Sequence, residues 1–564
     1  MERRQFLRNA AIGMAGTMAL NGWSCRPDQA WLDQLIKAND HRIPGLLGNQ
    51  VQDALSPLLG SVPDPFQIHH PGNAAGLVQA FTCAYVSPGS TYHGDEKLLA
   101  AMSLAMIYLR RVQHEDGTID LLTTNFHSTP DTAFVVEPLA LSYKLLSRES
   151  DGKSKELQNQ IRDFLVKAGL ALSTGGIHTP NHRWVVCMAL ARLSELFPDP
   201  AYSNRADAWL TEGIDIDSDG QYTERSTSVY SPLTNRCLIT IARLLNKEYL
   251  FEPVRKNLEM TLYYLHPNGE IVTETSRRQD QYQARNASAY HYPYLFMSLK
   301  DQNGAFGAMA RKIEKENSPG ELTGSLAYYL EDAQLLSTYP TGALPAEYEK
   351  LFDESGLVRW RNWDMDASLL SKNSTLFTLS NKDALLQAVR VATAFFGKGQ
   401  FIAEKLEKTG NGYRWTQTLE GPYFQPFPAD SLPGDGDWEK MPRDQRPRSE
   451  VQRMEYILEA HHEGDTWSLD FDLHGTDRVP VALELSFRSG GKLTGVEPVP
   501  GIEHAFFLKS TNGKYTMKGS NLFFGPGKNE HAWTQLRGAE PKIPGQSVYI
   551  TGYTPFKYQL KIHD

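Results

Sequence analysis

The sequence has little cysteine, no long apolar run past its first residues and no excess of positive charge. Its four cysteines in 564 residues include no Cys-x-x-Cys pair, and only three remain after Cys25, so a disulfide framework is not expected. Cys187 and Cys237 stand in apolar helical patterns, which indicates small core residues rather than nucleophiles. No apolar run beyond the N-terminus is long enough to span a bilayer, so no transmembrane segment is expected. The net charge of −9 argues against a nucleic-acid partner, but a local cluster of arginine and histidine can still bind an anionic sugar.

The N-terminus has the pattern of an export signal. Arg3-Arg4-Gln5-Phe6-Leu7 is followed by an apolar stretch from Ala10 to Leu20 and then by small residues. This order predicts a cleaved signal over residues 1–25, and the Arg-Arg-x-Phe-Leu start is similar to a twin-arginine signal. The alternative is a buried first helix. We therefore expect an exported, periplasmic protein. A lipid anchor on Cys25 is an open alternative, although Gly22 stands where lipoprotein signals usually have a leucine-like residue.

The length and the periodicity predict two domains and an α+β multidomain class. A chain of 564 residues is too long for one core. Residues 30–350 repeat apolar residues at helical spacing, as in Leu98–Leu109, Thr132–Leu146, Leu157–Leu172, Arg183–Leu196, Asn235–Leu245 and Glu321–Leu336. Residues 356–564 alternate as strands do, as in Leu357–Trp360, Leu385–Ala392, Trp467–Leu473 and Val481–Phe487. We expect an antiparallel β-sandwich there, interrupted by a long loop over residues 422–448, which are rich in proline, glycine and aspartate.

A weak internal repeat refines the prediction for the helical half. Four segments share a glycine, an apolar or aromatic residue and polar groups between two helices: Asp116–Asp120, Gly175–Thr179, Asp219–Glu224 and Asn268–Glu274. Their glycines are about 45 to 60 residues apart, which is the length of a helix pair with its loops. Stacked helical hairpins of this kind form an (α/α) toroid, an incomplete barrel whose equivalent loops open at the same end. The alternative is that glycines occur at this spacing by chance.

If the loops share one rim, the polar residues that follow each glycine converge. The loops offer, in order, Asn125 and His127; His178, Asn181, His182 and Arg183; Tyr222, Glu224, Arg225 and Tyr230; and Glu274, Arg277, Arg278, Gln279 and Asp280, followed by Tyr290, His291 and Tyr292. No serine or cysteine nucleophile stands beside an obvious base. The set suits β-elimination at a uronate, in which donors neutralise the carboxylate, a base takes the C5 proton and an acid protonates O4. Tyrosine can do either job, and adjacent arginines lower its pKa from about 10.

The motifs resemble those of the heparinase II/III-like and alginate-lyase-like polysaccharide lyases. Asn181-His182 opens a helix, similar to the family's Asn-His or Asn-Asn element, and Asp219–Glu224 with Tyr230 resembles its D-G-x-Y-x-E-G…Y segment. The resemblance covers nearly the whole mature chain. It implies that Asn181 binds the substrate carboxylate, that His182 is the base or neutraliser, and that Tyr230 is the acid or both acid and base. Arg225 stands where the family has glycine, so Tyr222 remains a second candidate for the catalytic tyrosine.

The sequence therefore predicts a lyase that acts on an anionic, uronate-containing oligo- or polysaccharide. The catalytic candidates are His182, Tyr230 and Tyr222, and the substrate-binding candidates are Asn125, His127, His178, Asn181, Glu224, Arg225, Arg278, Tyr290 and His291. Structural roles compete with these: helix capping for Asn181, core packing for Tyr230 and a solvated charge pair for Arg277 and Arg278.

Two other functions fit the same fold. One is a glycoside hydrolase that uses Glu224 with Glu274 or Asp131, and the other is a non-catalytic glycan-binding protein. No cofactor is predicted. Related lyases sometimes carry a structural zinc, but His69-His70, His461-His462 and His474 lack the spacing of metal ligands, so no metal is predicted either.

Overall fold

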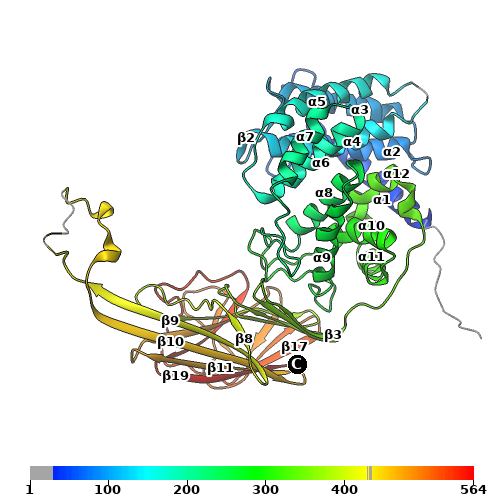
Figure 1. Cartoon of the computed structure of the whole chain (residues 1–564). Coiled ribbons are helices and arrows are strands. Elements are labelled where there is room, and N and C mark those ends of the chain that lie inside the picture. The colour runs from blue at the N-terminus through cyan, green and yellow to red at the C-terminus, as the bar shows by residue number, and fades with distance from the viewer. Residues whose placement is uncertain (1–28, 151, 429, 431–434) are drawn as a thin grey trace, which may run out of the picture.

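The computed structural model describes residues 29–564 except 151, 429 and 431–434, and Figure 1 shows it as a helical domain above a β-domain. The predicted export signal and Cys25 lie outside the described residues. The helices are α1 (Gln29–Asn49), α2 (Pro71–Val86), α3 (Glu96–Val112), α4 (Thr129–Leu146), α5 (Lys155–Thr174), α6 (Pro180–Leu196), α7 (Pro200–Leu210), α8 (Tyr230–Leu244), α9 (Phe251–Thr261), α10 (His291–Asp301), α11 (Gly304–Glu316) and α12 (Leu326–Glu331). Of the helices that the structure describes, none combines the length and apolar character needed to cross a membrane.

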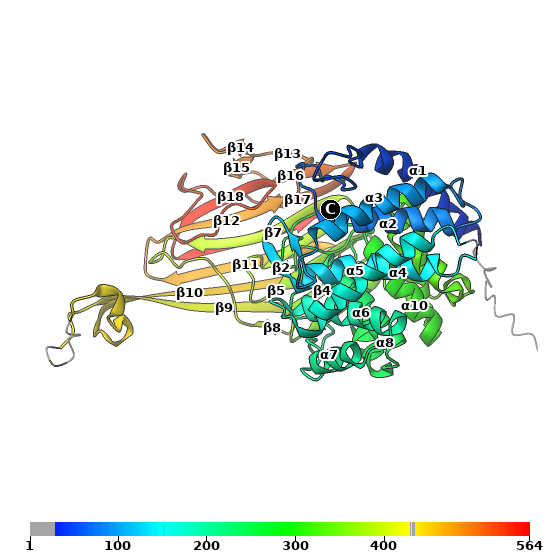
Figure 2. The same cartoon turned by 90° about the horizontal axis from the view of Figure 1, so that it is seen from above.

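The helices form the predicted toroid, with an inner and an outer layer. α2, α4, α6 and α8 pack one against the next, and α3, α5 and α7 lie outside them (Figure 2). The inner helices α4 and α6 are buried on nearly every face, as a helix enclosed by neighbours must be, whereas α5 is apolar along one stripe only. The predicted helix over residues 321–336 is instead a 3₁₀ segment (η3, Pro319–Ser325), the short α12 and a second 3₁₀ turn (η4, Ala333–Leu336). This segment packs against α1, α2 and α4.

Glycines position the loops of the predicted repeat. Gly117 and Gly220 have φ of +89° and +99°, a region that side chains rarely adopt. A Cβ on Gly117 would lie 2.2 Å from the carbonyl oxygen of Lys167 in α5, and one on Gly220 would lie 2.5 Å from that of Lys256 in α9. Each loop therefore rests directly on an outer helix. Since the inner helices begin after these loops, the N-terminal ends of α4, α6 and α8 face the same rim.

The β-domain is a sandwich of two sheets, as predicted. One has the order β14-β15-β18-β12-β7-β6-β5-β4-β3 and the other β13-β16-β17-β19-β11-β10-β9-β8. The pairing is antiparallel except between β15 and β18, which run parallel. The strands are β3 (Glu347–Phe352), β4 (Leu357–Asn362), β5 (Met365–Leu370), β6 (Phe377–Asn381), β7 (Ala384–Thr393), β8 (Leu406–Lys408), β9 (Gly412–Phe424), β10 (Arg448–Glu463), β11 (Thr466–Gly475), β12 (Pro480–Phe487), β13 (Lys492–Thr494), β14 (Glu497–Pro498), β15 (Ala505–Phe507), β16 (Gly513–Met517), β17 (Ser520–Gly525), β18 (Gln546–Tyr553) and β19 (Phe556–His563), and a small hairpin of β1 (Ile119–Leu121) and β2 (Asn125–Ser128) belongs to the toroid. Because β3 pairs with β4, the sandwich begins before the expected boundary at residue 356.

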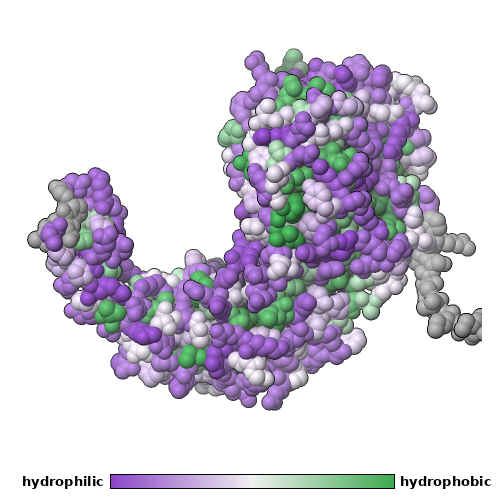
Figure 3. All heavy atoms as spheres, viewed as in Figure 1, coloured by the Kyte–Doolittle hydropathy of each residue, from purple (hydrophilic) through white to green (hydrophobic). Residues whose placement is uncertain are grey.

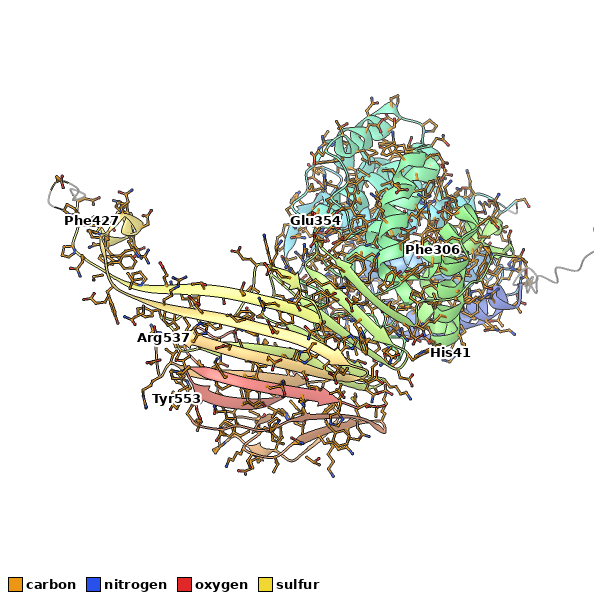
Figure 4. The ribbon with its side chains drawn as sticks, turned by 60° about the horizontal axis from the view of Figure 1, so that its bottom comes forward. His41, Phe306, Glu354, Phe427, Arg537 and Tyr553 are labelled. Carbon is orange, nitrogen blue, oxygen red and sulfur yellow. The ribbon has the colours of Figure 1, made fainter. Side chains whose placement is uncertain are left out.

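The hairpin of β9 and β10 extends beyond the sandwich as an arm. The two strands pair from His461 with Gly412 to Arg448 with Phe424, and the described residues of the loop predicted over 422–448 lie at the tip. Phe427 marks that tip in Figure 4, far from Glu354 in the β3–β4 turn of the sandwich. The space-filling view shows an open hollow bounded by the arm, the sandwich and the toroid (Figure 3).

A buried cluster of charges joins the toroid to the sandwich. His266, between α9 and α10, lies 3.0 Å from the Asp366 carboxylate in β5 and 3.2 Å from Glu274. Arg359 in β4 also pairs with Asp366 and donates to the carbonyl of Tyr263 at 2.9 Å. Burial lowers the pKa of His266, but the charges of Asp366 and Glu274 outweigh burial and raise it to about 9. The imidazole is therefore a cation between two carboxylates at neutral pH.

Candidate active site

Asn181 and Glu224 form a buried pair at the start of α6. The Asn181 side chain is 3% exposed, and its Nδ2 donates to Glu224 Oε2 at 2.7 Å. Thr179, and not Asn181, occupies the N-cap position, so helix capping does not explain the asparagine. Asn181 Oδ1 and Glu224 Oε1 are both buried without a hydrogen-bond partner, and such orphan atoms are costly unless a ligand satisfies them. Burial raises the pKa of the Glu224 carboxyl.

His182 is a neutral imidazole beside this pair. Its ring packs edge-to-face against His178 at 4.7 Å and against Phe134 of α4 at 6.4 Å, measured between ring centroids. Burial, together with electrostatic interactions with His178 and Arg278, lowers the pKa of His182 to about 4, although Asp131 acts in the opposite direction. Its Nδ1 is buried without a partner. A neutral imidazole with a free nitrogen can accept a proton at ordinary pH.

Tyr230 begins α8 and is half-buried, with its hydroxyl on the rim. Gln279 Nε2 donates to that hydroxyl at 3.0 Å, and the guanidinium carbon of Arg278 lies 5.3 Å from the centre of the ring. The Arg278 guanidinium makes no hydrogen bond or ion pair with any residue that the structure describes. Its charge also acts on His182 and on Glu224. Arg278 is thus a common neighbour of the His182 imidazole, the Glu224 carboxyl and the Tyr230 phenol.

The first loop reaches the same rim through Asp131 at the start of α4. Asn125 Nδ2 and Ser128 Oγ donate to Asp131 Oδ2 at 2.8 and 2.5 Å, so Asn125 lies at the edge of the candidate site. His127 points elsewhere: it is exposed, stacks on His114 at 3.8 Å and pairs with Asp116 at 2.7 Å. The structure therefore places the His127 side chain in a surface cluster of its own rather than beside Asn125.

Three predicted residues lie in the packed interior, which contradicts their assignment to the site. The Tyr222 phenol is 3% exposed and donates to Asn235 Oδ1 at 2.9 Å, and burial raises its pKa well above the ordinary value. Tyr290 is 1% exposed and donates to the carbonyl of Thr227 at 2.6 Å. His291 is fully buried and bonds Glu314 of α11. The side chains of Tyr222, Tyr290 and His291 pack the core, and of the two candidate tyrosines only Tyr230 presents its hydroxyl to the rim.

Two further predictions are corrected by contacts with the sandwich. Arg225, in a left-handed conformation with φ of 49°, donates to the carbonyl oxygens of Ser355 and Glu354 at 3.2 and 3.5 Å. Its side chain therefore joins the two domains. Glu274 is fully buried beside His266, which removes the Glu224–Glu274 pair required by one form of the glycoside-hydrolase alternative.

The thiols of Cys83, Cys187 and Cys237 are free and buried. Burial raises the pKa of the Cys83 and Cys237 thiols to about 12, so neither is a thiolate nucleophile at neutral pH. Within the described part of the chain, no group of three or more histidine, cysteine, aspartate or glutamate side chains could hold a metal ion. Sequence reasoning had not assigned Gln279 as the partner of Tyr230. The sequence offered one indication of this role, which is that Gln279 directly follows Arg278.

Solved structures show which fold this is. No protein-family model matches the sequence, and no curated protein matches it. Heparinase III superposes with a TM-score of 0.51 and 12% identity over 96% of this chain and 90% of that structure. A Paenibacillus xanthan lyase gives 0.57 and 11% over 96% of this chain, which spans 58% of that larger protein. A Streptomyces coelicolor chondroitin AC lyase bound to chondroitin sulphate gives 0.50 and 13% over 95% of this chain and 79% of that structure. This chain therefore has the toroid-and-sandwich fold of the polysaccharide lyases.

Proposed function

We propose that this chain is a polysaccharide lyase that cleaves a uronic-acid-containing glycan by β-elimination and leaves a 4,5-unsaturated uronate. The observation that carries the proposal is the Asn181–Glu224 pair, whose buried oxygens Oδ1 and Oε1 have no partner, beside a neutral histidine and a rim tyrosine. A glycan-binding protein needs no imidazole held neutral next to a phenol. The fold shared with heparinase III and xanthan lyase supports the same assignment.

Five side chains divide the reaction between them. Asn181 Nδ2 donates to Glu224 Oε2 and to Thr179 Oγ1 and so holds the Glu224 carboxyl, whose pKa burial raises. In its protonated form this carboxyl donates through Oε1 to the uronate carboxylate and stabilises the enolate-like charge. His182 takes the C5 proton, the C4–C5 double bond forms as the C4–O4 bond breaks, and Tyr230 protonates O4. Arg278 offsets the negative charge of the sugar. These residues carry out the proposed reaction without a cofactor.

The decisive assay measures product chemistry. Incubation with alginate, glycosaminoglycans and a glucuronate-bearing plant arabinogalactan should give, for at least one glycan, new ultraviolet absorbance from the C4–C5 double bond conjugated to the carboxylate. Reducing ends without that absorbance would indicate the glycoside hydrolase, for which Glu224 and Asp131 remain as a carboxylate pair. Binding without any product would indicate a glycan-binding protein.

The pH dependence of kcat/KM should follow the protonation of His182. Since His182 must be neutral to accept the C5 proton, kcat/KM should rise with pH through about 4, the lowered pKa of the free enzyme. Arg278→Gln removes a cation that lowers the pKa of His182. The acidic limb of the kcat/KM profile of this variant should therefore move to higher pH. Arg285→Gln, in the same loop but outside these contacts, is the matched control and should keep the wild-type limb. An acidic limb at the same pH in wild type, Arg278→Gln and Arg285→Gln would show that His182 is not the base.

We also propose that the protein is exported to the periplasm, where such a glycan would reach it. The twin-arginine-like start, Arg3-Arg4, supports this. Fractionation of cells that express the full chain, with and without an Arg3→Lys, Arg4→Lys change, tests it, because loss of export should follow loss of the paired arginines.

A further inference from the structure

A cavity opens at the N-terminal part of α8, the helix that begins with Tyr230. It has a volume of about 380 Å³ and lies between the N-terminal part of α8, the start of α10 and the η3–α12 segment. Cavities that hold small ligands occupy about 300–1,000 Å³. Val229, which lines the cavity, directly precedes Tyr230. The cavity therefore reaches the end of α8 at which Tyr230 lies.

Arg236 lines this cavity without an ionic partner. Its guanidinium makes no hydrogen bond or ion pair with a described residue, and its Nε is buried and unsatisfied. Neighbouring arginines on the inner wall differ: Arg192 pairs with Glu137 and Glu331, and Arg243 pairs with Glu331 and Asp332. A guanidinium nitrogen that is buried without a hydrogen-bond partner is costly, and an anionic ligand that binds this guanidinium lowers the cost.

The acidic groups near Arg236 are already engaged. Glu137 accepts hydrogen bonds from Arg192 and from the hydroxyl of Tyr328. Glu321, on the cavity wall, accepts from Ser318 through Oε2 and from Asn286 through Oε1. Because Glu321 keeps its negative charge, it repels an anion at its end of the cavity. The acidic group of a ligand should therefore sit at the Arg236 end.

The rest of the wall suits a sugar ring. Tyr292 and Tyr328 stack with ring centroids 4.3 Å apart and planes 23° from parallel, which makes a rigid aromatic surface. Val229 and Leu233 add apolar contacts, and Ser288 adds a hydroxyl. A ring with an apolar face, hydroxyls and one negative charge complements these groups.

We propose that this cavity is a second sugar subsite, in which Arg236 binds the carboxylate or sulfate ester of the residue next to the sugar that reacts. The cavity's preference for an acidic sugar does not depend on the lyase activity, whereas its position next to the reacting sugar rests on the proposed function. The glycan would then carry an acidic group on neighbouring residues.

The binding test uses monosaccharides, which cannot be cleaved, so it is independent of the lyase assay. Asn181→Ala protein, in which the catalytic carboxylate site is impaired, is titrated with D-glucuronate, D-glucose 6-sulfate and D-glucose by ligand-detected NMR. At least one of the acidic sugars should bind and glucose should not, and the stronger acidic ligand identifies the carboxylate or the sulfate. Addition of Arg236→Met should abolish this binding, whereas addition of Arg110→Met, an exposed arginine on α3, should not.

The kinetic test applies once a cleavable oligosaccharide is known. Arg236→Met should raise KM about 10- to 100-fold, the effect of losing hydrogen bonds to a charged group, with kcat nearly unchanged. Ala289→Phe, which fills the exposed mouth of the cavity and keeps the charge, should raise KM in the same way. Acidic-sugar binding that survives in Arg236→Met, or no acidic-sugar binding in Asn181→Ala protein, would overturn the subsite even if the lyase assay succeeds.

Discussion

Replacement of Tyr230 by phenylalanine should abolish turnover and leave the fold intact. The change removes only the hydroxyl, which in the structure accepts a hydrogen bond from exposed Gln279, so no buried group loses its partner. If the phenol protonates O4, its loss should lower kcat about 10²- to 10⁴-fold, the usual contribution of a general acid. Initial rates of unsaturated-product formation, with thermal unfolding as the check on the fold, measure the effect.

The matched control is Tyr249→Phe, because Tyr249 is an exposed tyrosine in the turn before α9. It should retain the wild-type rate. Oligosaccharide binding to Tyr230→Phe should stay close to wild type, which separates loss of chemistry from loss of substrate. A Tyr230→Phe enzyme that turns over within a few-fold of wild type would remove the phenol from the mechanism and leave His182 or water as the acid.

Asp366→Asn should give the largest loss of stability. The change removes the charge that holds His266 and Arg359 in the buried junction between the toroid and the sandwich. Breaking a buried pair in this way leaves uncompensated cations and costs about 3–5 kcal/mol. The shift of the first denaturant-induced transition measures it. The double variant Asp366→Asn, Arg359→Met should recover part of the loss, because it removes one stranded cation.

The pH dependence provides an independent check on this junction. The pKa of His266 is raised to about 9, so its stabilising charge is fully present below its unfolded value of about 6.5 and is lost as pH rises through 9. Wild-type stability should fall across this window, and the fall should be much smaller in Asp366→Asn, because the raised pKa depends on Asp366. An equal fall in both proteins would show that other groups cause it.

The sequence predicts the layers of this fold better than the direction of individual side chains. The apolar spacing identified α3 to α6, and the four loop segments indicated a shared rim, because both features are local. Tyr222 and Tyr230 could not be separated, since each follows the same glycine and only packing decides which phenol is buried. Arg225 was misassigned because its partners, the carbonyls of Ser355 and Glu354, belong to another domain. Arg236 was not singled out because a lone arginine in an apolar helix resembles any other until its neighbours are known.

The β9–β10 arm has a practical consequence. Its tip, around Phe427, lies far from both cores (Figure 4), and exposed turns rich in proline and glycine are where proteases cut and where insertions are tolerated. Because the strands remain paired below the tip, a chain cut there would stay assembled through its ladder of backbone hydrogen bonds. The tip is thus a natural attachment point for a dye, an affinity tag or a solid support.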